Sequence, residues 1–164
     1  MPVTYRSDVP AILQTANWTC SACALAWMNR SLSIDVATDE WSAVSYIGTP
    51  TNINSEWGLM DSSGSRLREC LSEQGAPAFN AWLDWHSVWL MAEEMPLLIG
   101  GVTWNHWSGV RYTAYDYLVL ANPAPGWLGI EQTMTESQFN YLGPFAVVAV
   151  PLNIQFPPLP ETES

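Results

Sequence analysis

The sequence of 164 residues contains no lysine, and its five basic residues are all arginines. Against them stand 16 aspartates and glutamates, so the formal net charge is −11. A chain this acidic repels the phosphates of nucleic acids and the headgroups of anionic membranes, and we expect neither as a partner. The same charge favours neutral or basic peptides as substrates through electrostatic steering.

Long apolar runs and cysteines are also scarce. No apolar stretch reaches the roughly 18–20 residues of a membrane-spanning helix, so no membrane span is expected. The three cysteines, Cys20, Cys23 and Cys70, are odd in number and too few for a disulfide framework. The N-terminus lacks a basic segment followed by a long apolar one, so no signal peptide is predicted. A cytoplasmic and an exported location both stay open, as does the oligomeric state.

The hydrophobic content, in contrast, is high. A hydrophobic fraction of 48% excludes extensive disorder, and the length suits one domain. We predict a single domain over residues 1–152, followed by a proline-rich, acidic tail over residues 153–164. Ten tryptophans are also present, and tryptophan usually packs cores and interfaces but also stacks on sugars. A Trp-rich sugar-binding module, with a row of exposed Trp side chains, is therefore an alternative.

The periodic patterns predict helices in the first half of the chain and strands in the second. Four helices are expected over residues 21–32, 38–46, 63–74 and 84–94. Their N-caps are expected at Thr19 or Asn17, at Thr38 and at Asp84. Strands are expected over residues 96–102, 106–115, 117–121 and 146–150, with a short helix over 135–141 behind a capping box. This order indicates an α+β fold with a mostly antiparallel sheet.

Cys20 is the candidate nucleophile, because it stands at the start of the first predicted helix. The backbone N–H groups and the dipole at a helix N-terminus lower the pKa of a thiol, and the thiolate is the nucleophile. The N–H group of the same residue can face a developing oxyanion. Gln14, six residues upstream, can supply a second donor to that oxyanion.

The base and its orienting partner are expected from the strands. His106 opens the strand after Gly100 and Gly101, where it can take the thiol proton and later protonate the leaving amine. Asn122 follows the next strand and can fix the tautomer of the imidazole. An antiparallel pairing through a turn near Asp116 would bring these two side chains close together.

These blocks, in their order along the chain, resemble the papain-like cysteine peptidases. The segment 14–25 is similar to their nucleophile helix, most of all in the bacterial group related to the double-glycine leader peptidases that process bacteriocin precursors. The later blocks that agree in order are the segment 96–101, His106 with Trp107, the segment 120–126, a short helix with Phe139, and Gly143 before a closing strand. The resemblance covers about residues 11–150.

The resemblance implies a papain-like α+β fold, in which the nucleophile helix packs on a C-terminal sheet. It implies a hydrolase of peptide or amide bonds with Cys20 as nucleophile, His106 as base, Asn122 as orienting residue and Gln14 as oxyanion donor, acting on a peptide or protein without a metal or other cofactor. Two positions depart from the group's pattern: Ser21 replaces the usual Gly, and Asn122 replaces the usual Asp. A neutral Asn stabilises the imidazolium less than a carboxylate does.

Three tryptophans flank the expected catalytic residues. Trp18, Trp104 and Trp107 are close in sequence to Cys20 or His106. We expect them to bind substrate as walls of the cleft and to keep water away from the thiolate–imidazole pair.

Other interpretations of the same residues stay open. Cys23 is one turn beyond Cys20 and is the alternative nucleophile, although cysteine is more often a small core residue. The two cysteines also form a C-x-x-C pair, as in redox sites, and together with Cys70 and a histidine they could hold zinc. His86 is expected to be a helix-surface or packing residue rather than the base. At the level of function, the alternatives are a catalytically idle papain-like domain that binds a peptide and a hydrolase of cell-wall peptides.

Overall fold

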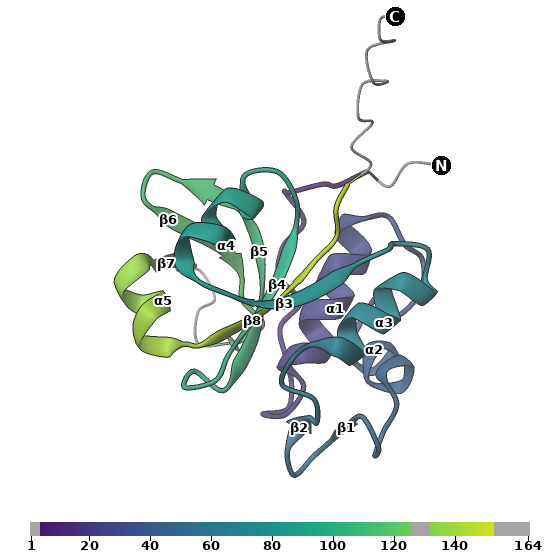
Figure 1. The fold of residues 1–164 in the computed structure, drawn as a ribbon. Helices are drawn as coiled ribbons and strands as arrows, with labels where there is room; N and C mark the ends of the chain where they lie inside the picture. The colour runs from purple at the N-terminus through teal and green to yellow at the C-terminus, as the bar shows by residue number, and fades with distance from the viewer. Residues whose placement is uncertain (1–3, 126–131, 153–164) are drawn as a thin grey trace, which may run out of the picture.

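A computed structural model describes residues 4–125 and 132–152 of the chain (Figure 1). The predicted tail over residues 153–164 lies outside the described residues. Three helices gather on one side of the molecule, and a sheet with two further helices forms the other side (Figure 1). The candidate catalytic residues come from both sides, so the junction between them decides the geometry of the site.

The helices of the described residues lie where the sequence predicts helices, with ends shifted by one or two residues. They are α1 Cys20–Ser31, α2 Glu40–Ile47, α3 Ser65–Glu73, α4 Trp85–Ala92 and α5 Glu136–Leu142. The carboxylate of Asp84 caps α4, and Thr135 and Gln138 form the predicted capping box of α5. None of the helices in the described residues has the length and apolar character that crossing a bilayer requires.

One predicted N-cap is wrong, and another is confirmed in position but makes no capping hydrogen bond. The N-cap of α2 is Asp39 rather than Thr38, because the Asp39 carboxylate accepts the N–H of Ser42 in a capping box. Thr19 is the N-cap residue of α1, but its side chain makes no capping hydrogen bond. The single proton of the Thr19 hydroxyl is instead shared between the carbonyl of Ala16 and a carboxylate oxygen of Glu40. Thr19 thus ties the start of α1 to α2 and leaves the first N–H groups of α1 without a side-chain cap.

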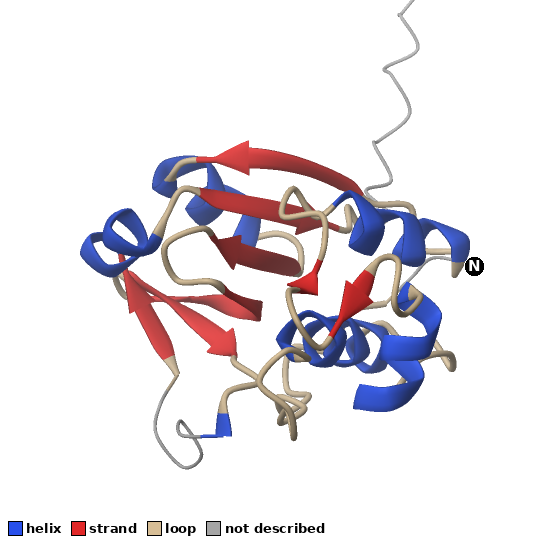
Figure 2. Cartoon of the chain, turned by 90° about the horizontal axis from the view of Figure 1, so that it is seen from below, coloured by secondary structure: helices blue, strands red, loops and turns tan. Residues whose placement is uncertain are grey.

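Six antiparallel strands form the main sheet, in the order β3-β8-β4-β5-β6-β7. They are β3 Phe79–Leu83, β4 Leu97–Gly101, β5 His106–Ala114, β6 Tyr117–Ala121, β7 Thr133–Thr135 and β8 Phe145–Ala149. The two short strands β1 Ile53–Asn54 and β2 Gly58–Leu59 pair separately, and Figure 2 shows them apart from the main sheet. The predicted α+β class and antiparallel sheet are confirmed.

The main sheet separates two apolar cores. Along β4, Leu98 packs into the core shared with α1, α2 and α3, whereas Leu97 and Ile99 pack into the core beneath α4 and α5. On the first side, α1 is almost wholly buried between the sheet and the other helices. Gly109 of β5 makes this close approach possible, because a Cβ there would overlap the buried ring of Trp27.

Candidate active site

Cys20 is the first residue of α1, the helix that packs against β4 and β5 of the sheet. The packing of α1 against β5 brings the first turn of the helix next to the first residues of the strand. The backbone N–H of Trp107, the second residue of β5, donates to the Cys20 sulfur at 3.4 Å. The candidate nucleophile is therefore held by a helix on one side and a strand on the other.

A buried carboxylate holds the loop that precedes Cys20. Glu40, the first residue of α2, is only 6% exposed. Its oxygens accept the N–H of Thr15 at 2.7 Å, the hydroxyl of Thr15 at 2.6 Å and the hydroxyl of Thr19 at 2.5 Å. Burial alone would raise the pKa of Glu40, but these hydrogen bonds together outweigh it and lower the pKa. The charged carboxylate thus fixes the chain on the approach to Cys20.

His106 and Asn122 meet across neighbouring strands. The Nε2 atom of His106 lies 2.6 Å from the Oδ1 atom of Asn122. The antiparallel register of β5 and β6, with Gly109 opposite Ala121, produces this contact, and the turn between the two strands lies at residues 115–116 as predicted. An edge-on contact with the ring of Trp104, at 4.8 Å between centroids, further confines the imidazole.

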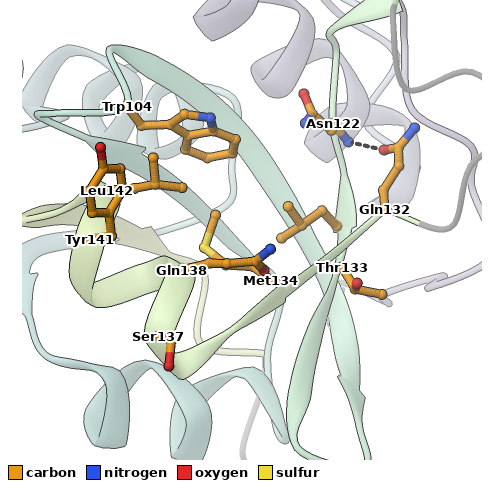
Figure 3. A pocket seen from close by; sticks show the side chains of 10 residues that line it. Trp104, Asn122, Gln132, Thr133, Met134, Ser137, Gln138, Tyr141 and Leu142 are labelled. Atoms are coloured by element: carbon orange, nitrogen blue, oxygen red, sulfur yellow. Dashed lines mark hydrogen bonds between the residues drawn. The ribbon is translucent and has the colours of Figure 1, made fainter.

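Asn122 is itself tightly held and only 1% exposed. Its Oδ1 atom also accepts the N–H of Ala124 at 3.0 Å, and its own backbone N–H donates to Oε1 of Gln132 at 2.6 Å (Figure 3). With Oδ1 accepting from Ala124, the oxygen is the atom that faces the ring. Nε2 of His106 therefore carries the proton of the contact, which leaves Nδ1 as an unprotonated acceptor.

Burial opposes charge on both candidate catalytic groups. It raises the pKa of the Cys20 thiol, although the N–H groups of Trp107, Ser21 and Cys20 itself act in the opposite direction. It lowers the pKa of His106, and the hydrogen bond to Asn122 only partly offsets this. Both shifts favour a neutral thiol beside a neutral imidazole at neutral pH. Among the described residues, no hydrogen bond joins this thiol to this imidazole.

Cys20 and His106 line one cleft of about 400 Å³. The cleft lies between the start of α1, the turn that joins β1 to β2, and the turn that joins β4 to β5. The other residues that line it are Asn17, Trp18, Ser55, Glu56, Trp57, Gly58, Leu59, Ser62, Gly100, Gly101, Val102, Asn105 and Trp107.

Gln14 does not line this cleft. Its side-chain amide donates to the carbonyl of Ala16 at 2.9 Å, and its Oε1 atom is buried without a hydrogen-bond partner. Its backbone N–H donates to the carbonyl of Pro123 at 2.9 Å, which ties the loop before α1 to the segment after β6. One amide N–H of Gln14 remains available, so its role as oxyanion donor stays a prediction.

The three predicted wall tryptophans take different positions. Trp18 and Trp107 line the cleft, but Trp107 is only 7% exposed and its ring lies over Gly100, where a Cβ would overlap it. Trp104 lines a second, more apolar cavity of about 430 Å³ beside Asn122 (Figure 3). Trp107 thus contributes mainly through packing and its backbone N–H, and Trp104 through its contact with His106.

The alternative residues lie elsewhere. Cys23 and Cys70 are fully buried in α1 and α3, and burial raises the pKa of the Cys70 thiol to about 12. His86 is exposed on α4. Over the described ranges, no three side chains of His, Cys, Asp or Glu gather as a metal site would require. Of the five tryptophans Trp82, Trp85, Trp89, Trp104 and Trp107, Trp82 alone is exposed, so they form no sugar-binding row.

Sequence reasoning missed two supporting residues and one wall of the cleft. In the sequence, Glu40 is only an acidic residue in the first turn of a helix, where the helix dipole favours it. No local sequence pattern predicts its hydrogen bonds to Thr15 and Thr19. Gln132 precedes β7, an edge strand that the periodicity does not reveal. The cleft wall formed by Glu56 and Trp57 lies between two strands of two residues each, which are too short for any pattern.

No protein-family model matches the sequence, and no curated protein matches it. Solved structures do match. A double glycine motif protease from an AMS/PCAT transporter, solved in complex with the leader peptide, has a TM-score of 0.68 and 17% identity over 91% of this chain and 97% of that one. The peptidase domain of Streptococcus ComA, a bifunctional ABC transporter involved in a quorum-sensing pathway, has a TM-score of 0.65 and 14% identity over 87% and 98%.

A C39-like peptidase from Bacillus anthracis is also similar, with a TM-score of 0.60 and 12% identity over 92% of this chain and 98% of that one. Similarity at identities this low shows a shared fold but not a shared reaction. All three matches nevertheless span nearly the whole of a peptidase domain. The resemblance deduced from the order of the sequence blocks is therefore confirmed in fold: the chain has the same architecture as these double-glycine and C39-like peptidase domains.

Proposed function

We propose that the protein is a cysteine hydrolase that cleaves a peptide or amide bond. The observation that carries this proposal is the 2.6 Å contact between His106 and Asn122 at the edge of the cleft that holds Cys20. A half-buried imidazole with a fixed tautomer, in the same cleft as a thiol at a helix N-terminus, suits thiol acyl transfer. The peptidase fold of the structural neighbours supports the same reaction class.

The reaction begins from the neutral pair. Nδ1 of His106 takes the proton of the Cys20 thiol as the sulfur attacks the carbonyl carbon of the substrate. Asn122 keeps the imidazole ring in place through Nε2 while the imidazolium forms. The imidazolium then gives its proton to the leaving amine, and water hydrolyses the thioester to release the acid and the free thiol.

The oxyanion of the tetrahedral intermediate forms at the N-terminus of α1. The N–H of Cys20 is the first donor, and the remaining side-chain N–H of Gln14 is the second in this proposal. The N-terminal dipole of α1 favours the same negative charge. Removal of one such donor typically lowers the rate by about 100-fold or more.

The substrate is proposed to be a peptide with small residues before the scissile bond. Gly58, Gly100 and Gly101 line the cleft, together with Trp18 and Trp57. A neighbour of the same fold is described as a double glycine motif protease bound to a leader peptide. A peptide that contains Gly-Gly before the cleaved bond is therefore the first substrate to test.

Thiol reactivity tests the proposal directly. We expect iodoacetamide to label Cys20 faster than Cys70, and His106→Ala to slow the labelling of Cys20 alone. Because burial raises the pKa of Cys20, labelling should accelerate as pH rises above neutrality rather than level off in acid. Mass spectrometry of peptides from the labelled protein measures each site. Equal labelling of Cys20 and Cys70, independent of His106, would reject the hydrolase.

A second candidate is a catalytically idle domain that only binds a peptide. The raised pKa of Cys20 and the neutral partner of His106 favour it, because both disfavour the charged thiolate–imidazolium pair. Saturable binding of a Gly-Gly peptide without turnover, together with slow labelling of Cys20, would select this function. Release of peptides from purified cell wall would instead select a cell-wall hydrolase.

A further inference from the structure

The turn between β1 and β2 presents a carboxylate and an indole to the cleft. Glu56 and Trp57 occupy this turn, and both line the cleft that contains Cys20 and His106. Both side chains are exposed, Trp57 to 70%. Unlike a core tryptophan, Trp57 therefore keeps the face of its ring available to a ligand.

The turn between β1 and β2 is held in a defined conformation by hydrogen bonds and packing. The Oδ1 atom of Asn54 accepts the N–H groups of Glu56 at 3.0 Å and Trp57 at 2.9 Å. Gly58 follows with a φ of +71°, and a Cβ there would approach the carbonyl of Trp18 to 3.3 Å. The turn is thus packed against the residues just before α1, and Glu56 stands at a defined place on the rim.

The charge of Glu56 is not balanced within the described residues. Their ion pairs involve Arg6, Arg66 and Arg68, and none includes Glu56. The lining of the cleft contains no arginine, and the lowered pKa of His106 keeps that imidazole neutral at neutral pH. A ligand that enters the cleft therefore meets one uncompensated negative charge.

We propose that Glu56, together with the indoles of Trp57 and Trp18, selects a peptide with a lysine or arginine side chain close to the scissile bond. The carboxylate attracts the cation, and an indole face adds a cation–π contact of about 0.5–1 kcal/mol at an exposed site. The bound peptide excludes water from the rim and strengthens both interactions. This specificity rests on the proposed function, since it concerns the substrate of the same cleft.

Direct binding separates this specificity from catalysis. Peptides with a central Gly-Gly carry lysine or Nε-acetyl-lysine at each flanking position in turn, and fluorescence anisotropy measures their dissociation constants with the Cys20→Ala protein. At one or more positions, the peptide with lysine should bind about fivefold more tightly than the peptide with acetyl-lysine at low salt. This is the gain in affinity expected from one exposed ion pair and one cation–π contact.

Two variants test whether Glu56 is the source of the preference. Glu56→Gln should remove it, and Asp116→Asn should keep it. Asp116 is an exposed carboxylate in the turn between β5 and β6, at the opposite end of β5 from His106, and its substitution changes the net charge equally.

Each outcome decides the question. Loss of the lysine preference in E56Q but not in D116N, with a preference that weakens as salt rises, supports the selection by Glu56. A preference that persists in E56Q, an equal loss in both variants, or no binding of any peptide overturns it. Absence of turnover by the wild-type protein, while the lysine preference in binding stands, overturns the proposed hydrolase and leaves the selection by Glu56 intact.

Discussion

The two sides of the candidate active site are held in opposite ways. On the helix side, a buried charged carboxylate, Glu40, binds the loop before Cys20 through two threonines. On the sheet side, neutral amides hold the imidazole: Asn122 contacts His106, and Gln132 anchors the backbone of Asn122. The first arrangement depends on a charge, and the second depends on strand register.

This difference indicates which side tolerates change. When the buried carboxylate of Glu40 is replaced, its hydrogen-bond donors stay in place. These donors are then left without a charged acceptor, which is costly in a buried site. A register of backbone hydrogen bonds keeps its geometry when one side chain is altered. Substitution of Glu40 should therefore act on stability, whereas substitution of Asn122 should act on the protonation and orientation of His106.

The largest expected effect is the loss of the base. His106→Ala should lower kcat/KM for a Gly-Gly peptide by about 1,000-fold, because general base catalysis contributes about 100- to 10,000-fold. The matched control is His86→Ala on the exposed surface of α4, which should leave kcat/KM unchanged. Steady-state kinetics with both variants makes the measurement, and similar rates for the two would remove His106 from the mechanism.

The next effect concerns stability on the helix side. Glu40→Gln should lower the free energy of unfolding at pH 7 by about 3 kcal/mol, because three hydrogen bonds lose their charged acceptor. The lowered pKa of Glu40 stabilises the fold above the pKa of the unfolded carboxyl, and this stabilisation is lost as pH falls through the lowered value. The difference between wild type and variant should therefore shrink in acid.

Urea denaturation at several pH values provides this measurement. Glu136→Gln is the matched control, because Glu136 is also the first residue of its helix, α5, but is exposed. Any shared effect of the helix dipole cancels between the two variants. A cost in E40Q no greater than in E136Q would show that the buried charge does not hold this side together.

A third pair of variants compares packing near the site with packing away from it. Gly100→Ala should lower the free energy of unfolding by about 2 kcal/mol, because a Cβ at Gly100 overlaps the ring of Trp107. Gly109→Ala should cost a similar amount through the ring of Trp27. Only G100A should also lower peptide turnover, since Trp107 donates its N–H to Cys20. Equal turnover by the two variants would mean that the position of Trp107 does not matter for the thiol.

The smallest effect is electrostatic and lies on the sheet side. Asn122→Asp should raise the pKa of His106, because a carboxylate stabilises the imidazolium more than a neutral amide does, by about 1 kcal/mol. The acid limb of the kcat/KM profile should move to higher pH with it. NMR titration of His106, with His86 as internal reference, measures the change. An unmoved or lowered pKa would contradict the contact between Nε2 and residue 122.

Much of the fold was readable from local pattern. The strand over Tyr117–Ala121 was predicted to the residue, because a buried central strand is a continuous apolar run. The two strands of the main sheet that escaped prediction, β3 and β7, are its edges. An edge strand is buried on fewer sides, so β3 mixes exposed and half-buried residues and gives no clear periodicity.

For the candidate site, too, the sequence predicts the position of a residue in an element better than the direction of its side chain. Cys20, His106 and Asn122 could be selected because each stands at the end of a predictable element. Gln14 was selected by spacing; its amide donates one bond to the carbonyl of Ala16, and its role as oxyanion donor stays a prediction. Trp104 was expected in the cleft and lines the neighbouring cavity instead. Spacing along the chain predicts that residues can approach, but it does not predict the direction of a side chain.

The sequence alone specifies which elements form and which reactive groups stand at their ends, because helix starts, apolar runs and turns are local properties. Only the tertiary structure decides that Glu40 binds Thr19 across 21 positions, that Gln132 anchors Asn122, and that Glu56 joins Cys20 in one cleft. These contacts depend on how helices dock on the sheet. Burial then sets the pKa values of Cys20 and His106, and burial exists only once the chain has folded.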